Sequence, residues 1–312
     1  MILCVTLNPC LDKTLVAPTW RPGTMVRCRS IREVCGGKGN NVARALRRLG
    51  RTARPVAFFG GDVGARCERL LRDDDGLVPL EIRTHAPTRV ITTIRTEDTS
   101  LQTSFFDPDP SISETEAEML FRAVEIELAT GSIEALTLSG SSPSATTHGL
   151  YSELIGLSQT KRVPVFLDTY GPALEAIWAF RPDALQMNRR EAAAHLKIES
   201  PSDADLVGLL ERWSRRGVTR GVVTHGEKAA LCLIDGVTYR ATPPEVDVVN
   251  PVGSGDSLLA GLVDAHLEGL DAEATIRRSL ACGVANALVW DAGAIEPRDV
   301  HLIEAEVHVE RI

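Results

Sequence analysis

The chain has 312 residues, 44% of them apolar and 24% charged, so it can bury a large core, and we expect residues 1–312 to form a single α/β domain. A net charge of −8 argues against a nucleic-acid partner, and no apolar run approaches the ~20 residues that span a bilayer, which argues against a membrane partner. Seven cysteines without a C-x-x-C pair, histidines without zinc spacing and a start without a secretion signal predict free thiols, no zinc site and a cytoplasmic location.

The predicted elements begin with a short buried strand, because residues 2–7 form an apolar run of strand length. Residues from about 12 to 34 then alternate apolar and polar side chains around prolines and a glycine, without a helical period. Residues 88–106 repeat this pattern on either side of a predicted turn at residues 97–100. We expect both stretches to form antiparallel strands of a small sheet inserted into the domain.

The remainder of the chain alternates short buried strands with helices. Ser113, with Glu116 three residues later, has the pattern of a capping box and predicts the start of a helix. The other expected strands are residues 56–59, 135–139, 163–167, 184–187 and 221–224, and the other expected helices start at Ala65 or cover residues 203–216, 254–268 and 275–289. Such alternation is typical of a mostly parallel sheet with helices on both faces.

A first glycine-rich segment, CGGKGNNVARALRRLG at residues 35–50, places a lysine among three glycines. It continues into a helix with one apolar face made by Val42, Ala43, Leu46 and Leu49. Lys38 is a point charge suited to a phosphate, on a backbone that glycine lets approach closely. From this segment alone, a solvated loop lysine remains the more common explanation. The arginine clusters at residues 44–48 and 212–216 are interpreted as solvated helix faces.

A second segment, NPVGSGDSLLAGLV at residues 250–263, leads from a glycine turn into an apolar helix. Gly253 and Gly255 allow turn conformations that other residues resist. The amides of residues 253–256 then stand unpaired at the positive end of the helix dipole, where phosphate binds readily. Asp256 would repel a phosphate, so its position suggests that it takes a proton from the hydroxyl that attacks the phosphate. An ordinary helix N-terminus with an acid in its first turn is the alternative.

Together the two segments resemble the paired signatures of the ribokinase-like (phosphofructokinase-B) carbohydrate kinases. The first signature is matched at Gly36, Gly37, Gly39, Asn41, Ala43, Gly50 and Gly60, and the second from Asn250 through Val263. The resemblance extends to the TLNP run at residues 6–9, Asp12, the SGS run at residues 139–141, Asp168, Asn188 and Glu191. It implies a three-layer α/β/α fold with a mostly parallel central sheet, and a small β-sheet that forms a lid over the sugar site and mediates a homodimer.

The resemblance also implies roles for particular residues. Asp256 would be the general base, and Gly253, Ser254 and Gly255 would hold the transferring phosphoryl group. The residues implied to bind the sugar substrate are Asp12, Gly37, Lys38, Gly39, Asn41, Arg89 and Ser139. The residues implied to bind ATP are Asn188, Glu191, Thr224, Gly226 and Asn286, although Asn286 alone would be interpreted as a helix-surface amide. Asp168 and Glu191 would serve Mg²⁺ through water and the nucleotide phosphates. Outside the family, an N-cap or a surface acid explains these two acids equally well.

The GGKG form of the first loop resembles the branch that acts on phosphorylated sugars, which includes 1-phosphofructokinase and tagatose-6-phosphate kinase. Lys38 and Arg89 would bind the phosphate that the substrate already carries. The expected reaction is ATP-dependent phosphorylation of fructose 1-phosphate to fructose 1,6-bisphosphate. Tagatose-6-phosphate kinase and 6-phosphofructokinase activities are the alternatives.

Several positions depart from the family pattern. Gln186 stands where lysine is common, Met187 replaces a proline, and the loop at residues 224–229 lacks a second glycine. Asn250 replaces an aspartate that serves a monovalent cation, and the FFDPDP run at residues 105–110 differs from a glycine-containing run. These departures bear on nucleotide affinity, potassium activation and substrate identity.

Two other classes of protein are compatible with parts of the sequence. The GKGNNV run approximates the G-x-G-x-x-G of dinucleotide-binding oxidoreductases, but its third glycine is missing and no first βαβ strand precedes it. A sugar-phosphate sensor without catalysis would explain the altered nucleotide loop, but the intact Asp256 argues against it.

Overall fold

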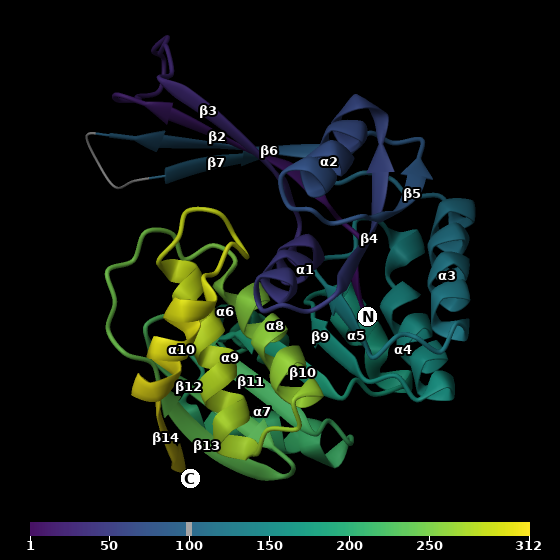
Figure 1. The fold of residues 1–312 in the computed structure, drawn as a ribbon, viewed down its shortest axis with the longest axis vertical. Helices are drawn as coiled ribbons and strands as arrows, with labels where there is room; N and C mark the ends of the chain where they lie inside the picture. The colour runs from purple at the N-terminus through teal and green to yellow at the C-terminus, as the bar shows by residue number, and fades with distance from the viewer. Residues whose placement is uncertain (98–101) are drawn as a thin grey trace.

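The central strand β1 (Ile2–Thr6) shows how the chain builds two helical layers on one sheet. Its side chains alternate between the faces, as those of any strand do. Ile2 and Cys4 join the core under one layer of helices, whereas Leu3 and Val5 join a second core under the other layer. The computed structural model describes residues 1–97 and 102–312, and Figure 1 shows this body with the small sheet standing apart from it.

The main sheet has ten strands in the order β14-β13-β12-β11-β10-β9-β8-β1-β4-β5. Its strands after β1 are β4 (Ala53–Gly60), β5 (Leu80–Thr84), β8 (Ala135–Ser139), β9 (Val165–Asp168), β10 (Ala184–Asn188), β11 (Arg220–His225), β12 (Lys228–Ile234), β13 (Val237–Thr242) and β14 (His308–Arg311). Pairing is parallel from β5 to β11 and antiparallel from β11 to β14. The mostly parallel sheet is confirmed. The antiparallel edge formed by β12, β13 and β14 was not predicted.

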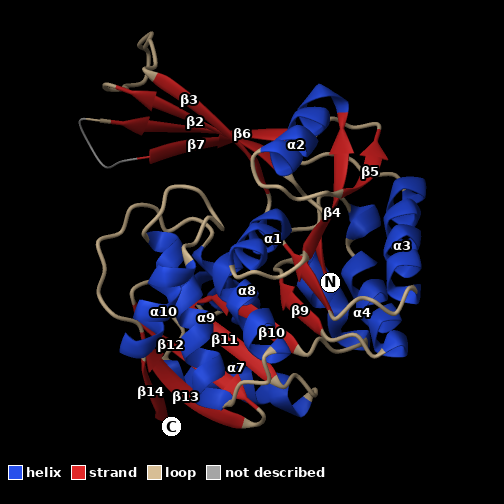
Figure 2. Cartoon of the chain, viewed as in Figure 1, coloured by secondary structure: helices blue, strands red, loops and turns tan. Residues whose placement is uncertain are grey.

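Helices cover both faces of this sheet, as Figure 2 shows in blue. One layer contains α1 (Lys38–Arg48), α2 (Gly61–Asp73), α8 (Ser254–Leu267), α9 (Ala272–Ala287) and α10 (Pro297–Glu306). The other contains α3 (Glu114–Ala129), α4 (Leu150–Lys161), α5 (Pro172–Ala176), α6 (Arg189–Leu196) and α7 (Asp203–Arg215), with the short 3₁₀ turns η1 (Ala145–Thr147) and η2 (Ile177–Ala179). The capping box of Ser113 and Glu116 at the start of α3 is confirmed. None of the helices in the described ranges is long and apolar enough to cross a membrane.

The small sheet consists of β3 (Ser30–Gly36), β2 (Cys10–Ala17), β6 (Arg89–Thr96) and β7 (Gln102–Phe106), in that order. β2 pairs antiparallel with β3, and β6 pairs antiparallel with β7, but β2 and β6 run parallel. The expectation of a wholly antiparallel sheet is therefore wrong at its centre. The chain passes through α1, β4, α2 and β5 between β3 and β6, and such a long crossover permits parallel pairing. Most of the turn predicted at residues 97–100 lies outside the described residues.

Candidate active site

The candidate site lies at the carboxyl ends of the parallel strands, where open α/β sheets bind their ligands. β9 ends at Asp168, and β10 ends at Asn188, which the sheet register places beside Thr224 of β11. β1 lies between β8 and β4, and the chain leaves it first towards β4 and later returns to β8. The acids and amides singled out in the sequence thus converge at the point where the strand order reverses.

A cavity of about 1360 Å³ lies at this edge and reaches the small sheet. Most of the predicted site residues line it: Asp12, Gly37, Lys38, Asn41, Arg89, Asp168, Asn188, Glu191, Thr224, Gly226, Gly253, Ser254, Gly255 and Asp256. Segments more than two hundred residues apart in the sequence therefore share one solvent-accessible space.

Three predicted site residues, Gly39, Ser139 and Asn286, do not line the cavity in this structure, and the binding roles expected of them stay predictions. Gly39 lies against β1, where an added Cβ would sit 2.3 Å from the Thr6 hydroxyl, so the glycine serves helix–strand packing. Ser139 is fully buried behind its neighbours. Asn286 is also fully buried rather than a surface amide: its Nδ2 donates to the Val252 carbonyl at 2.8 Å, and its Oδ1 accepts from the Gly293 amide at 2.7 Å.

The N-terminus of α8 opens into the cavity as an anion-binding cradle. Gly253 caps the helix with a φ of 89°, and a Cβ there would lie 2.5 Å from the Cβ of Ala292, so this position requires glycine. Gly255 belongs to the helix and has no positive φ, so the expectation that it forms the turn is wrong. The Ser254 amide bonds the Pro251 carbonyl at 3.2 Å. Within the described ranges, the amides of Gly255 and Asp256 meet no acceptor and remain available to a phosphate.

Asp256 is a buried acid beside this cradle, with 5% of its surface exposed. Its Oδ2 accepts a hydrogen bond from Asn41 Nδ2 at 2.8 Å. Burial, and after it the nearby Asp168 carboxylate, raises the pKa of Asp256 to about 7, against the opposing effects of Lys38 and the hydrogen bond from Asn41. A carboxylate whose pKa lies near neutrality is suited to accept a proton at physiological pH.

The orientation of Asn41 is fixed by a residue that the sequence did not reveal as part of the site. Arg44 Nη1 donates to Asn41 Oδ1 at 3.0 Å, so the amide nitrogen must face Asp256. Arg44 is itself paired with Asp75, to which its Nε and Nη2 each donate at 2.7 Å. Only 4% of Arg44 is exposed, so the interpretation of residues 44–48 as a solvated face is wrong at this position. The three-residue spacing from Asn41 was the available signal, since it places both side chains on one helix face.

Lys38 lies between two of the acids expected to serve the nucleotide and Mg²⁺. Its Nζ is 2.7 Å from Asp168 Oδ1 and 3.2 Å from Glu191 Oε1. The Lys38 pKa is raised, because these carboxylates outweigh the cost of burial, and burial raises the pKa of Asp168. Asp168 is thus neither a surface acid nor an N-cap, whereas Glu191 forms a capping box with Asn188 at the start of α6.

Two features bear on a metal ion at this end of the cavity. Oδ2 of Asp168 is buried and meets no hydrogen-bond donor within residues 1–97 and 102–312. No cluster of three or more metal-ligating side chains occurs among the described residues. This donor set fits Mg²⁺ that keeps several waters and is held by one or two carboxylates and by phosphates.

Three positions that depart from the family pattern lie in or near the cavity wall. Gln186 is buried in the cavity wall, and a Cβ on Gly255 would lie 3.0 Å from its Nε2. Gly226 has a φ of 60° and open space around it. Asn250 donates from Nδ2 to the Trp290 carbonyl at 2.7 Å and accepts from the Val252 amide at 3.2 Å, so its neutral amide ties two loops together.

Arg89 lines the cavity from β6 of the small sheet. Its Nη2 donates to the Asn8 carbonyl at 3.2 Å, and its Nη1 donates to Asp109 Oδ1 at 3.0 Å. In the described part of the chain, Arg89 and Lys38 share no contact partner. Asp12 lines the cavity from β2, and burial raises the pKa of its carboxyl group.

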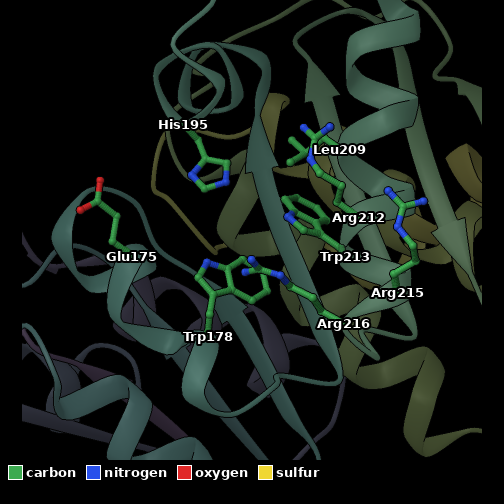
Figure 3. A pocket seen from close by; sticks show the side chains of 8 residues that line it. All are labelled: Glu175, Trp178, His195, Leu209, Arg212, Trp213, Arg215 and Arg216. Atoms are coloured by element: carbon green, nitrogen blue, oxygen red, sulfur yellow. The ribbon is translucent and has the colours of Figure 1, made fainter.

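A second cavity, of about 420 Å³, lies among α5, η2, α6 and α7. Figure 3 shows His195, Trp178 and Trp213 around it, with the Arg216 guanidinium 4.3 Å from the Trp178 ring centroid. Its surrounding arginines are exposed, as expected for residues 212–216. None of the predicted site residues lines this cavity.

Comparisons with known proteins identify the family and the fold of the chain. A family model described as pfkB family carbohydrate kinase matches residues 5–299. Phosphofructokinase-2 from Escherichia coli, in complex with potassium, is 26% identical with a TM-score of 0.88, and the match covers 98% of both chains. The same enzyme in complex with fructose-6-phosphate is 26% identical with a TM-score of 0.85 over 98% of both chains. A possible 1-phosphofructokinase from Thermotoga maritima has the same fold, with 23% identity and a TM-score of 0.85 over 100% of this chain and 99% of that chain.

Proposed function

The chain belongs to the pfkB family of carbohydrate kinases, and on this premise we propose that it is a 1-phosphofructokinase, which phosphorylates fructose 1-phosphate with ATP. As a phosphofructokinase-like sugar kinase of ribokinase-like fold, it is a phosphotransferase with an alcohol acceptor, so the oxidoreductase alternative is wrong. One observation carries the proposal: the buried Asp256 stands beside the open amides of α8, in the same cavity as Arg89.

The chemistry follows from this arrangement. Asn41 holds Oδ2 of Asp256, which leaves Oδ1 to take the proton of the acceptor hydroxyl. The hydroxyl oxygen then bonds to the γ-phosphorus of ATP as the bond from that phosphorus to the bridging oxygen breaks, and ADP leaves. Negative charge develops on the oxygens in transfer, and the amides of Gly255 and Asp256 offer fixed donors to it.

ATP would lie against the ends of β10 and β11, where Asn188, Thr224 and Gly226 line the cavity. Asp168 and Glu191 would hold Mg²⁺ through water and the nucleotide phosphates, and the ion would neutralise phosphate charge there. Lys38 already contacts both acids, so it stands close to where the phosphates would arrive.

The sugar would lie under the small sheet. Asp12 would accept hydrogen bonds from sugar hydroxyls, and Arg89, with Lys38, would bind the phosphate that the sugar already carries. We also propose that the small sheet acts as a lid and mediates a homodimer. A 6-phosphofructokinase is the second candidate, because the Escherichia coli phosphofructokinase-2 structure with fructose-6-phosphate matches nearly the whole chain. Tagatose 6-phosphate is the third candidate substrate.

The test is an ADP-release assay on fructose 1-phosphate, fructose 6-phosphate, tagatose 6-phosphate and unphosphorylated fructose. Lys38→Ala and Arg89→Ala should each lower kcat/KM for the preferred phosphosugar by roughly one to two powers of ten, since charge-assisted contacts contribute about 1.5–3 kcal/mol. Lys13→Ala, which removes a lid-strand lysine that does not line the cavity, is the matched control. Preference for another phosphosugar would replace fructose 1-phosphate, and preference for free fructose would contradict a phosphosugar kinase. Absence of turnover on every sugar would favour the sensor.

A further inference from the structure

A carboxylate of the chain, that of Asp109, already pairs with Arg89, the cation that we assign to the substrate phosphate. Asp109, in the loop that follows β7, accepts from Arg89 Nη1 at 3.0 Å and from Asn8 Nδ2 at 2.8 Å through the same oxygen, Oδ1. The Asp109 side chain is 46% exposed, whereas that of Arg89 is 14% exposed. The ion pair therefore sits at the rim of the cavity, with the arginine on its inner side.

Arg89 and Asn8 both line the cavity, but Asp109 does not. Arg89 Nε is also buried, and no acceptor meets it anywhere in the described part of the chain. The Nε–H of the guanidinium is thus unused, while Nη1 and the Asn8 amide both donate to Asp109. Carboxylates and phosphates use the same donors of arginine, so the two anions compete for this position.

The loop is anchored on both sides of Asp109. Asp107 bonds both backbone groups of Val90: its amide donates to the Val90 carbonyl at 3.0 Å, and its Oδ2 accepts from the Val90 amide at 2.9 Å. Ile112, three residues after Asp109, is 1% exposed and belongs to the core. The short segment between them, which includes two prolines, can release Arg89 by rotation of the Asp109 side chain towards solvent while its anchors stay in place.

We propose that Asp109 is a specificity-determining residue that acts as an internal competitor for the phosphate of the acceptor sugar. In the absence of substrate, its carboxylate neutralises Arg89. A phosphosugar must displace this carboxylate, whereas an unphosphorylated sugar leaves the ion pair intact. Asp109 therefore lowers the affinity for phosphorylated acceptors without affecting ATP. This inference rests on the proposed function, because it takes Arg89 as the phosphate-binding cation.

The kinetic experiment compares wild type with Asp109→Asn, and with Asp109→Ser as a second variant that keeps a small polar side chain. KM for fructose 1-phosphate should fall roughly 1.5- to fivefold in both variants, the range expected for a partly exposed ion pair, and KM for ATP should stay the same. Asp107→Asn removes the same charge two residues away and is the matched control. An unchanged KM would overturn the proposal, and so would a higher KM, which would make Asp109 a ligand of the sugar. An equal fall in KM for ATP, or in the Asp107→Asn control, would also overturn it, since it would indicate a general charge effect.

A binding experiment separates this inference from the kinase assignment. Calorimetric titration of inorganic phosphate, without ATP or sugar, should show tighter binding to Asp109→Asn than to wild type, and the gain should vanish in the Asp109→Asn/Arg89→Ala double variant. If no sugar is phosphorylated but this pattern holds, the proposed function fails while the competition stands. If fructose 1-phosphate is phosphorylated but phosphate binds both proteins equally, only the competition is refuted.

Discussion

Asp256→Asn is the substitution that most directly tests the chemistry, because it removes proton acceptance and little else. An asparagine fits the same space and can still accept from Asn41 Nδ2, which now lies 2.8 Å from the carboxylate. The amides at the start of α8 belong to the backbone and do not change. A positioned general base contributes roughly 10²–10⁴ in rate, so we expect kcat to fall by that factor while KM for ATP stays close to wild type.

The pH profile gives the same substitution a second readout. The pKa of Asp256 is raised to about 7, chiefly by burial, and only the ionised form can accept a proton. Wild-type kcat should therefore fall about tenfold for each pH unit below 7, whereas the residual rate of Asp256→Asn should lose this dependence. Asp62→Asn, at an exposed acid in the first turn of α2, is the matched control and should keep both the wild-type rate and its profile.

As pH rises, the stability of the folded protein should fall while its activity increases. Because the folded pKa lies above the ordinary value of 3.8, the folded protein holds this proton more tightly than the unfolded chain. Stability from this group is lost as pH rises from about 4 to about 7. The Tm of Asp256→Asn, relative to wild type, should therefore increase between pH 5 and pH 8. For the kinetic prediction, the contrary result is an Asp256→Asn variant that keeps half the wild-type kcat while the chemical step is rate-limiting. That result would refute the role of Asp256 as base.

Three further predictions concern the surroundings of this acid. Gly253→Ala should abolish turnover, because its φ is 89° and an added Cβ would lie 2.5 Å from the Cβ of Ala292. Gly255→Ala should lower kcat less, because the Gln186 side-chain amide that the new Cβ would meet at 3.0 Å can move. Measuring kcat of both variants tests this difference. Arg44→Met should lower the free energy of unfolding by roughly 3–5 kcal/mol in urea titrations, since it breaks a buried ion pair, and the exposed Arg47→Met should not. Replacing potassium by sodium should leave kcat nearly unchanged, because Asn250 carries no charge and spends its amide on two backbone groups.

The sequence predicted the elements whose periodicity is local. Strand β1, the parallel strands and the capping box of α3 follow from apolar runs and from Ser113 and Glu116, which lie within a few residues of one another. The parallel pairing of β2 with β6 joins segments about eighty residues apart, and no local pattern encodes its direction. The antiparallel edge of the main sheet, β12 to β14, was not predicted for the same reason, because the apolar pattern of a short strand does not indicate the direction of its pairing.

The site residues likewise differ in how far local sequence could predict them. Residues that face the cavity from a glycine loop or a strand end, such as Asp256 and Asp168, could be predicted from the family signatures. The burial of a side chain could not be predicted in this way, because it depends on neighbours that are distant in the chain. Arg44 lies within a cluster of arginines but is buried by its bond to Asp75, and Asn286 lies on a helix but is enclosed by the loops of residues 252 and 293.

The charges along the cavity explain why the pKa of Asp256 is raised towards neutrality. Lys38 pairs with Asp168 and Glu191, and Arg89 pairs with Asp109. Asp256 lies near Asp168 and Lys38, and within the described residues it has no ion pair and one side-chain hydrogen bond, from the neutral amide of Asn41. Lys38 and Asn41 therefore offset only part of the cost of burying its charge, which is the condition that raises a carboxyl pKa. A carboxyl group with a pKa near neutrality and no ion pair is suited to take the proton of the hydroxyl that attacks.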